Sequence, residues 1–207
     1  MSFDLGGDPE LLIADVGQNL WEEVNLGFKG ANYGWNIKEG AHCFDPDDPF
    51  HSPEQCRDTG HLLDDPLIDP IIEYPNHHHQ PDGLGSAVIG GHIYRGASLP
   101  HFHGRYIFGD WSAHHFEEAE GLLLIAQPRK SGLWKVAELR IQNRPEGRLG
   151  HFVLGFGEDA AGELYVLTTD NDRPNRSDGQ GLSNRTPGPA LSAVRTGYPG
   201  GAYGECP

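Results

Sequence analysis

Residues 156–167, FGEDAAGELYVL, show the pattern of a β-hairpin: a short segment, a turn that contains glycine, and the β-rich run Leu164–Leu167. Residues 3–15, FDLGGDPELLIAD, repeat this pattern, and residues 104–110, GRYIFGD, give a partial copy. The outer copies lie about 150 residues apart, or three units of roughly fifty, which is the period of a four-stranded propeller blade. We therefore predict an all-β fold, a partial β-propeller of about three blades.

The remaining sequence favours the same fold class. Apolar runs are short, no long stretch keeps helical periodicity, and 29 glycines and 16 prolines supply turns. We expect residues 1–171 to form the partial propeller and residues 172–207 to form an irregular or disordered tail, which could also reflect a changed reading frame. Three blades leave two faces uncovered, so the chain looks too short to close a ring.

The charge balance limits the class of partner. Acidic residues outnumber basic ones by 30 to 15, which gives a net charge of −15. Nucleic-acid binding depends on clusters of Lys and Arg, so we expect no nucleic-acid partner. No apolar run approaches the roughly 18 residues of a membrane span, and we expect no such span.

The three cysteines bear on localisation. Cys43 and Cys56 bracket a loop rich in Pro and Asp, and a metal-binding pair would normally be more closely spaced. We interpret the two as a disulfide, with free thiols as the alternative, whereas Cys206 has no evident partner. A disulfide indicates an oxidising compartment, so we expect an extracellular or periplasmic protein, although no signal peptide is recognisable at Met1.

A longer set of motifs carries a resemblance to a known family. Residues 14–25, ADVGQNLWEEVN, are followed by residues 30–35, GANYGW. Residues 90–96, GGHIYRG, residues 104–111, GRYIFGDW, and residues 156–167 complete the set. Over about residues 2–170 the chain resembles the soluble PQQ-dependent glucose/sorbosone dehydrogenase family, which also includes the propeller of hedgehog-interacting proteins.

The resemblance implies a six-bladed ring, of which this chain would be the C-terminal half. It also implies oxidation of a sugar hydroxyl by hydride transfer to pyrroloquinoline quinone (PQQ), with calcium polarising the quinone carbonyls. By residue match, the carbonyls of Gly17 and Gln18 would hold that calcium, and Trp111 would lie near the cofactor. Glu23 and Tyr33 would contribute to a structural calcium site. A tight turn at Gly17 and a solvated or salt-bridged carboxylate at Glu23 are the plain alternatives.

Departures from the family pattern limit the expected activity. The family's histidine base and the Arg-Asn pair that grips PQQ precede the matched region, and no lysine stands near Ser112, where the PQQ-binding lysine would fall. We expect a fragment of an aldose oxidoreductase that uses PQQ and calcium, acts on a sugar or another small molecule, and is inactive alone. The alternative is a carbohydrate- or protein-binding propeller without redox chemistry, and the third interpretation is a truncated product without independent function.

Histidine and tryptophan clusters complete the candidates. Residues 77–79 are three consecutive histidines, and His114 and His115 form a later pair. Consecutive histidines point in different directions and rarely chelate one ion, so we favour an exposed loop over a metal site at residues 77–79. Four tryptophans are expected to pack between blades: Trp21, Trp35, Trp111 and Trp134.

Overall fold

The structure is a computed structural model that describes residues 2–3, 11–60, 65–114, 118–142, 144–170 and 187–190. These residues form thirteen β-strands and two single-turn 3₁₀ helices, at Pro100–Phe102 and Pro145–Gly147. Within the described residues, no helix has the length and apolar character needed to cross a lipid bilayer. The predicted all-β class is confirmed.

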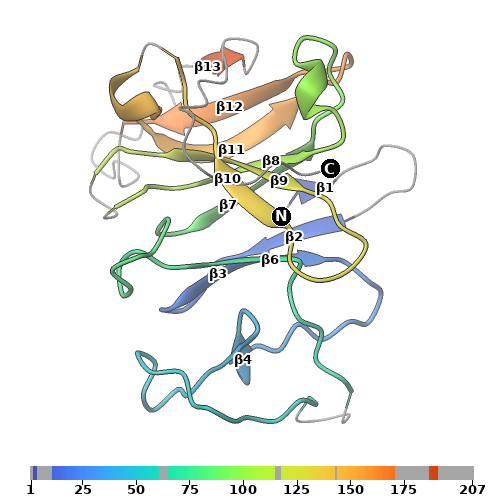
Figure 1. Cartoon of the computed structure of the whole chain (residues 1–207), viewed down its shortest axis with the longest axis vertical. Helices are drawn as coiled ribbons and strands as arrows, with labels where there is room; N and C mark the ends of the chain where they lie inside the picture. Colours follow the sequence, from blue (N-terminus) through green and yellow to red (C-terminus); the bar gives the residue numbers. More distant parts are fainter. Residues whose placement is uncertain are drawn as a thin grey trace, which may run out of the picture.

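Two four-stranded antiparallel sheets form most of the fold (Figure 1). Sheet one has the order β1-β2-β3-β6, with bounds Ser2–Phe3, Leu11–Asp15, Trp21–Leu26 and Ile72–Pro75. Sheet two has the order β10-β9-β8-β7, with bounds Lys135–Glu138, Leu122–Gln127, Tyr106–Asp110 and Val88–Ile93. Each sheet therefore has the strand number and meandering order of one propeller blade.

A third sheet follows in sequence and in space. It has the order β11-β12-β13, with bounds Phe152–Glu158, Leu164–Thr169 and Pro187–Ala190. Strand β13 lies within the range predicted as an irregular tail; the remainder of residues 172–207, Cys206 included, falls outside the described residues. Sheets one and three cover opposite faces of sheet two (Figure 1). This stack of three sheets is the predicted partial propeller.

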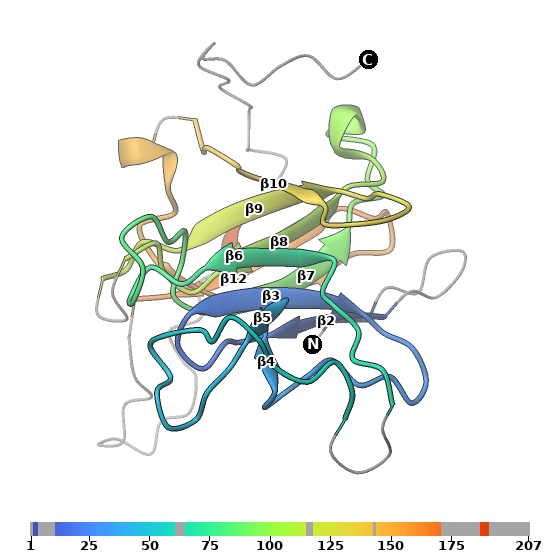
Figure 2. The same cartoon turned by 60° about the horizontal axis from the view of Figure 1, so that its bottom comes forward.

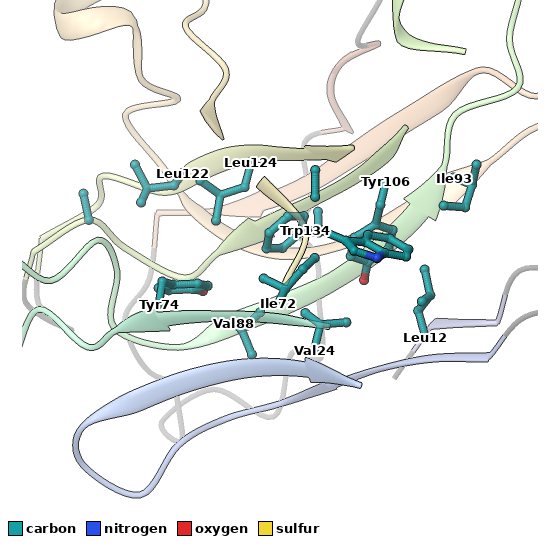
Figure 3. Packing of buried hydrophobic residues seen from close by; sticks show 13 residues of the cluster. Leu12, Val24, Ile72, Tyr74, Val88, Ile93, Tyr106, Leu122, Leu124 and Trp134 are labelled. Carbon is teal, nitrogen blue, oxygen red and sulfur yellow. The ribbon is translucent and has the colours of Figure 1, made fainter. Parts of the chain in front are cut away.

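Strict alternation along β8 and β9 explains why sheet two is covered on both faces. Tyr106 and Phe108 belong to the apolar cluster shared with sheet one, whereas Ile107 between them belongs to the cluster shared with sheet three. Figure 3 shows the first cluster, in which Trp134 also lies. A strand buried on both faces reads as a continuous apolar run, as Leu122–Ala126 does.

The outer face of sheet three is apolar and accessible. Along β12, Leu164 and Val166 are buried, whereas Tyr165 and Leu167 between them are 40% and 37% exposed. Leu154 on β11 is 41% exposed. Period-two alternation places these side chains on the two faces of the strand, so the exposed set lies on the face turned away from sheet two.

The connection from β3 to β6 runs from residue 27 to residue 71, and its described parts, residues 27–60 and 65–71, lie beside sheet one on the side away from sheet two (Figures 1 and 2). They contain the two-stranded sheet of β4, Lys38–Glu39, and β5, His42–Cys43. The predicted disulfide is present, with the sulfurs of Cys43 and Cys56 2.09 Å apart and a sequence separation of 13 residues. The bond closes a loop within this connection.

Two buried carboxylates join sheet one to sheet two. Glu22 on β3 accepts a hydrogen bond from the backbone N–H of Val88 at 2.9 Å, and its other oxygen accepts one from Asn76 Nδ2 at 2.7 Å. Asp110 on β8 accepts a hydrogen bond from the hydroxyl of Tyr74 on β6 at 2.6 Å. Both carboxylates therefore bridge strands of different sheets.

Asp110 also organises the backbone that leads into β7. One of its oxygens accepts the N–H groups of Ser86, Ala87 and Ser112 at 2.8, 3.0 and 3.1 Å. A Cβ on Gly85 would meet the carboxylate carbon at 2.2 Å, so the backbone passes too close for any side chain. The loop before β7 is thus formed around one carboxylate.

Burial shifts the pKa of both acids upward. It raises the pKa of Glu22 from an ordinary 4.5 to about 8, and the negative charge of Asp110 acts in the same direction. Burial also raises the pKa of Asp110. A carboxyl group whose pKa rises on folding binds its proton more tightly in the folded chain than in the unfolded chain. Ionisation of Glu22 therefore destabilises the fold.

The free energy of unfolding should accordingly fall as the pH rises from about 4.5 to about 8, because the folded chain holds the Glu22 proton through that window. Glu22→Gln should remove this part of the slope. Between pH 5 and pH 8 the native chain should lose more than about 1.4 kcal/mol relative to the variant, the equivalent of one pKa unit. Urea unfolding at a series of pH values measures this difference, and parallel pH profiles for the two proteins would contradict it.

Candidate functional site

Strand β3 presents its two consecutive glutamates to opposite faces of sheet one. Glu22 faces sheet two, so Glu23 faces the connection between β3 and β6. On that face Glu23 pairs in register with Asp15 of β2 and with Glu73 of β6. Directly opposed side chains lie about 4.5–5.5 Å apart at Cβ, so three carboxylates form one row across the sheet.

A pocket of about 250 Å³ opens at the Asp15 end of this row. It lies between the β2–β3 turn, β3 and β4. Its lining is acidic and aromatic and consists of Asp15, Val16, Gly17, Gln18, Trp21, Glu23, Trp35, Lys38, Glu39 and Gly40. The most conspicuous sequence motif and the hairpin of the connection thus meet in one place.

Glu39 holds the β2–β3 turn in shape. One of its oxygens accepts the backbone N–H groups of Asn19, Leu20 and Trp21 at 2.7, 2.7 and 3.1 Å. A turn leaves such donors without partners in a ladder, and a carboxylate is a strong acceptor for them. The wall of the pocket therefore depends on a side chain twenty residues away along the chain.

Gly17 is required by close packing of the backbone. A Cβ at this position would lie 1.8 Å from the carbonyl oxygen of Trp21 and 2.7 Å from a carboxylate oxygen of Glu39. No side chain can be accommodated at such distances without moving the turn. This geometry accounts for the glycine by turn packing, which is the plain alternative considered from the sequence.

Only one of the two carboxylate oxygens of Glu23 has a hydrogen-bond partner. One of its oxygens accepts a hydrogen bond from Asn25 Nδ2 at 2.8 Å, whereas the other is buried and has no hydrogen-bond partner. Burial raises the pKa of Glu23 from 4.5 to about 7, and the charges of Asp15 and Glu73 act in the same direction. The second oxygen of Glu39 is also buried without a partner.

The basic residue of the pocket lining is paired with a carboxylate that does not line the pocket. Lys38 is the basic residue in the pocket lining, and its ammonium group pairs with Asp69 at 2.6 Å. His42 stacks on Trp21 with ring centroids 3.8 Å apart and lies 3.4 Å from Glu73. Glu23 and Glu39, which line the pocket, each keep one buried oxygen without a hydrogen-bond partner.

The rim of the pocket is apolar. Trp35 is 57% exposed and Val16 is 52% exposed, and both line the opening. Trp35 packs against Phe44, with ring centroids 4.8 Å apart. The prediction that Trp35 packs between blades is wrong, because it lies on the connection beside sheet one. Exposed aromatic and aliphatic side chains around an acidic pocket form a surface suited to contact with another molecule.

The residues that the resemblance assigned to cofactor and calcium do not all lie at one place in the structure. Gly17, Gln18 and Glu23 line the pocket. Tyr33 does not, since its hydroxyl donates to the carbonyl of Leu26 at 2.8 Å, at the far end of β3. Trp111 stacks on Phe152 with ring centroids 4.7 Å apart, which is the expected packing between sheets two and three.

The residues expected for calcium are only partly gathered in the pocket. The Tyr33 hydroxyl bonds to the carbonyl of Leu26 at the end of β3, and close packing of the β2–β3 turn accounts for the glycine at position 17. Among the described residues, no three His, Cys, Asp or Glu side chains are grouped so that they could hold one metal ion. Calcium at Gly17, Gln18 and Glu23 stays a prediction, and we derive no chemistry from it.

The histidine clusters gather on the loops beside sheet two. His77 and His114 have ring centroids 5.2 Å apart, and Glu120 lies 3.2 Å from His114 Nε2. Arg148 reaches the same Glu120 oxygen at 2.8 Å. His115 falls outside the described residues. The sequence showed both histidine runs but not that they meet, because His77 and His114 are 37 positions apart along the chain.

Comparisons with known proteins find relatives that include two plant and two mammalian proteins. No protein-family model matches the chain. It is 28% identical over 208 residues to HIPL1 protein of Arabidopsis thaliana, covering 92% of this chain and 29% of the relative. It is 31% identical over 183 residues to HIPL2 protein of the same plant, covering 81% of this chain and 24% of the relative.

The other two relatives are mammalian. The chain is 27% identical over 95 residues to mouse Hedgehog-interacting protein, covering 45% of this chain and 13% of the relative. Human Hedgehog-interacting protein is similar at 29% identity over 96 residues. The chain spans less than a third of the length of each curated relative that it matches.

These relatives correct the functional expectation. The assignment to PQQ-dependent sugar dehydrogenases is wrong, and so is the oxidoreductase function that rested on it, because the matched proteins carry HIPL and Hedgehog-interacting names. The structure gives a physical reason. Gly17 packs the β2–β3 turn and Asp110 organises the loop before β7, so the shared motifs record the construction of the blades. Such residues cannot distinguish an enzyme from a binding protein.

Glu39→Ala should lower the free energy of unfolding by about 3 kcal/mol, because three N–H groups lose their acceptor. Glu39→Gln keeps one carbonyl oxygen for these donors and should lose only about 1 kcal/mol. Urea unfolding of the two variants provides the comparison. Equal losses in both, or no loss in either, would show that Glu39 does not hold the turn.

Proposed function

We propose that this chain is part of a non-catalytic, protein-binding propeller that acts in an oxidising compartment outside the cytoplasm, and that the pocket face of sheet one contacts the partner. The names of the two mammalian relatives carry the proposal, since they state interaction with another protein. The plant relatives extend the similarity over most of the chain. A protein partner is favoured over a carbohydrate for this reason.

Three structural features support this function. The disulfide between Cys43 and Cys56 is typical of proteins in oxidising compartments and crosslinks the connection that contributes Trp35 and Glu39 to the pocket. Trp35 and Val16 expose apolar surface at the rim, as interface residues do. Glu22 and Asp110, two buried acids with raised pKa values, accept backbone N–H groups and hold sheets together, which is a structural role.

Photocrosslinking tests the binding. The photoreactive residue p-benzoylphenylalanine replaces Trp35 in one variant and Lys130, an exposed residue of sheet two's outer loop, in a control variant. In secreted fluid of the source organism, position 35 should give a discrete protein adduct that excess unlabelled chain competes away. Absence of such an adduct, or equal labelling at both positions, would contradict a partner on this face.

A redox assay tests the absence of catalysis. The chain is incubated with PQQ, calcium chloride, an aldose and a reducible dye, and dye reduction is followed by absorbance. The rate should equal that of a control without protein. Protein-dependent dye reduction would contradict the non-catalytic function.

A further inference from the structure

We propose that the pocket beside sheet one receives an arginine side chain of the protein partner, with the guanidinium group held by the carboxylates of Glu23, Glu39 and Asp15. This inference rests on the proposed function in one respect, namely that the partner is a protein. The guanidinium plane would lie against Trp35. The evidence is an unbalanced set of charges, two unpaired oxygens and the shape of the lining.

The row of carboxylates carries negative charge that the basic residue of the pocket lining does not balance. Asp15, Glu23 and Glu73 lie side by side on three neighbouring strands, and like charges opposite one another destabilise a sheet. Lys38 does not relieve the repulsion, because its ammonium group pairs with Asp69. A cation bound in the pocket would relieve it. The row is therefore arranged for a positively charged ligand.

Two acidic side chains of the pocket lining each have one oxygen without a hydrogen-bond partner. Glu23 is 7% exposed and Glu39 is 4% exposed, and each has one carboxylate oxygen that is buried and unpaired. Buried polar atoms in native proteins almost always have a partner. Both side chains line the same pocket, and because their unpaired oxygens are closed to solvent, a donor that enters it reaches them only after the carboxylate groups turn toward the opening. Two acceptors from different elements call for a ligand with several donors.

The size of the pocket and the spacing of its acceptors favour a guanidinium group over a metal ion or an ammonium group. A volume of about 250 Å³ is far larger than a single ion needs, and no three acidic or histidine side chains of the described residues are grouped to hold one. A guanidinium group carries five N–H donors in a rigid fork and can bind carboxylates that are spread apart. An ammonium group is a compact point charge with three donors, and it matches this lining less well.

Two tryptophans give the pocket an aromatic surface that a cation can contact. Trp21 and Trp35 both line the pocket, and Trp35 is 57% exposed at its rim. The face of an indole ring attracts cations, and arginine stacks on it through its planar group. Trp35 belongs to the connection between β3 and β6, and Glu23 belongs to sheet one. An arginine inserted between them would contact both walls.

The direct test uses two peptides and an NMR titration. Acetyl-Gly-Arg-Gly-amide is the probe, and its twin with citrulline, which has the same shape and no charge, is the control. The indole N–H signal of Trp35 should shift saturably with the arginine peptide. The citrulline peptide should bind roughly tenfold more weakly or worse, because charge-assisted hydrogen bonds are lost.

Matched variants locate the site. Glu23→Gln keeps the shape and the acceptor for Asn25, and it should weaken arginine binding roughly tenfold. Glu158→Gln removes one negative charge from sheet three and should leave the binding unchanged. Equal binding of the two peptides, or no effect of Glu23→Gln, would overturn the inference. A saturable shift of the Trp35 signal by calcium chloride that displaces the peptide would also overturn it.

Crosslinking at position 35 separates this inference from the proposed function. If Glu23→Gln leaves the protein adduct intact, the arginine pocket is wrong and protein binding stands. If the arginine peptide binds but no protein adduct forms, the pocket stands and the protein partner is wrong. If Glu23→Gln abolishes both peptide binding and the adduct, both proposals are supported.

Discussion

The fold depends on two buried carboxylates that accept hydrogen bonds across the boundary between sheets one and two, Glu22 from the Val88 N–H and Asp110 from the Tyr74 hydroxyl. Glu22 and Asp110 together bind the consecutive N–H groups of residues 86–88, at the point where the chain enters β7. Apolar packing between the sheets is extensive but has no direction, whereas these hydrogen bonds fix one register and one separation. The cost is two acids whose burial opposes ionisation.

Strand β3 shows how one segment serves structure and recognition together. Glu22 is turned inward and acts on sheet two, and its neighbour Glu23 is turned outward to the pocket. Because side chains alternate along a strand, the same two positions cannot exchange these roles without a shift of register. Glu39 completes the arrangement by holding the turn that precedes β3. The pocket is therefore rigidly attached to the blade core.

Much of the fold could be predicted from the sequence, and the site only in part. The hairpin at residues 156–167 and the turn-bounded apolar runs predicted β-blades, and the loop between Cys43 and Cys56 predicted the disulfide. The row of Asp15, Glu23 and Glu73 could not be predicted, because it depends on a strand register that links residues fifty positions apart. The functional prediction was wrong for a related reason. Gly17 and Asp110 serve the construction of the blades, so the motifs that contain them indicate architecture and not chemistry.

The central claim, that Glu22 of sheet one and Asp110 of sheet two together hold residues 86–88 where the two sheets meet, can be measured by amide hydrogen exchange. Ser86, Ala87 and Val88 stand in or next to a loop, where exchange is normally fast. If the carboxylates hold these N–H groups, their exchange should be as slow as that of Ile107 in the core of β8. Exchange as fast as that of the exposed loop around Asp47 would contradict the account.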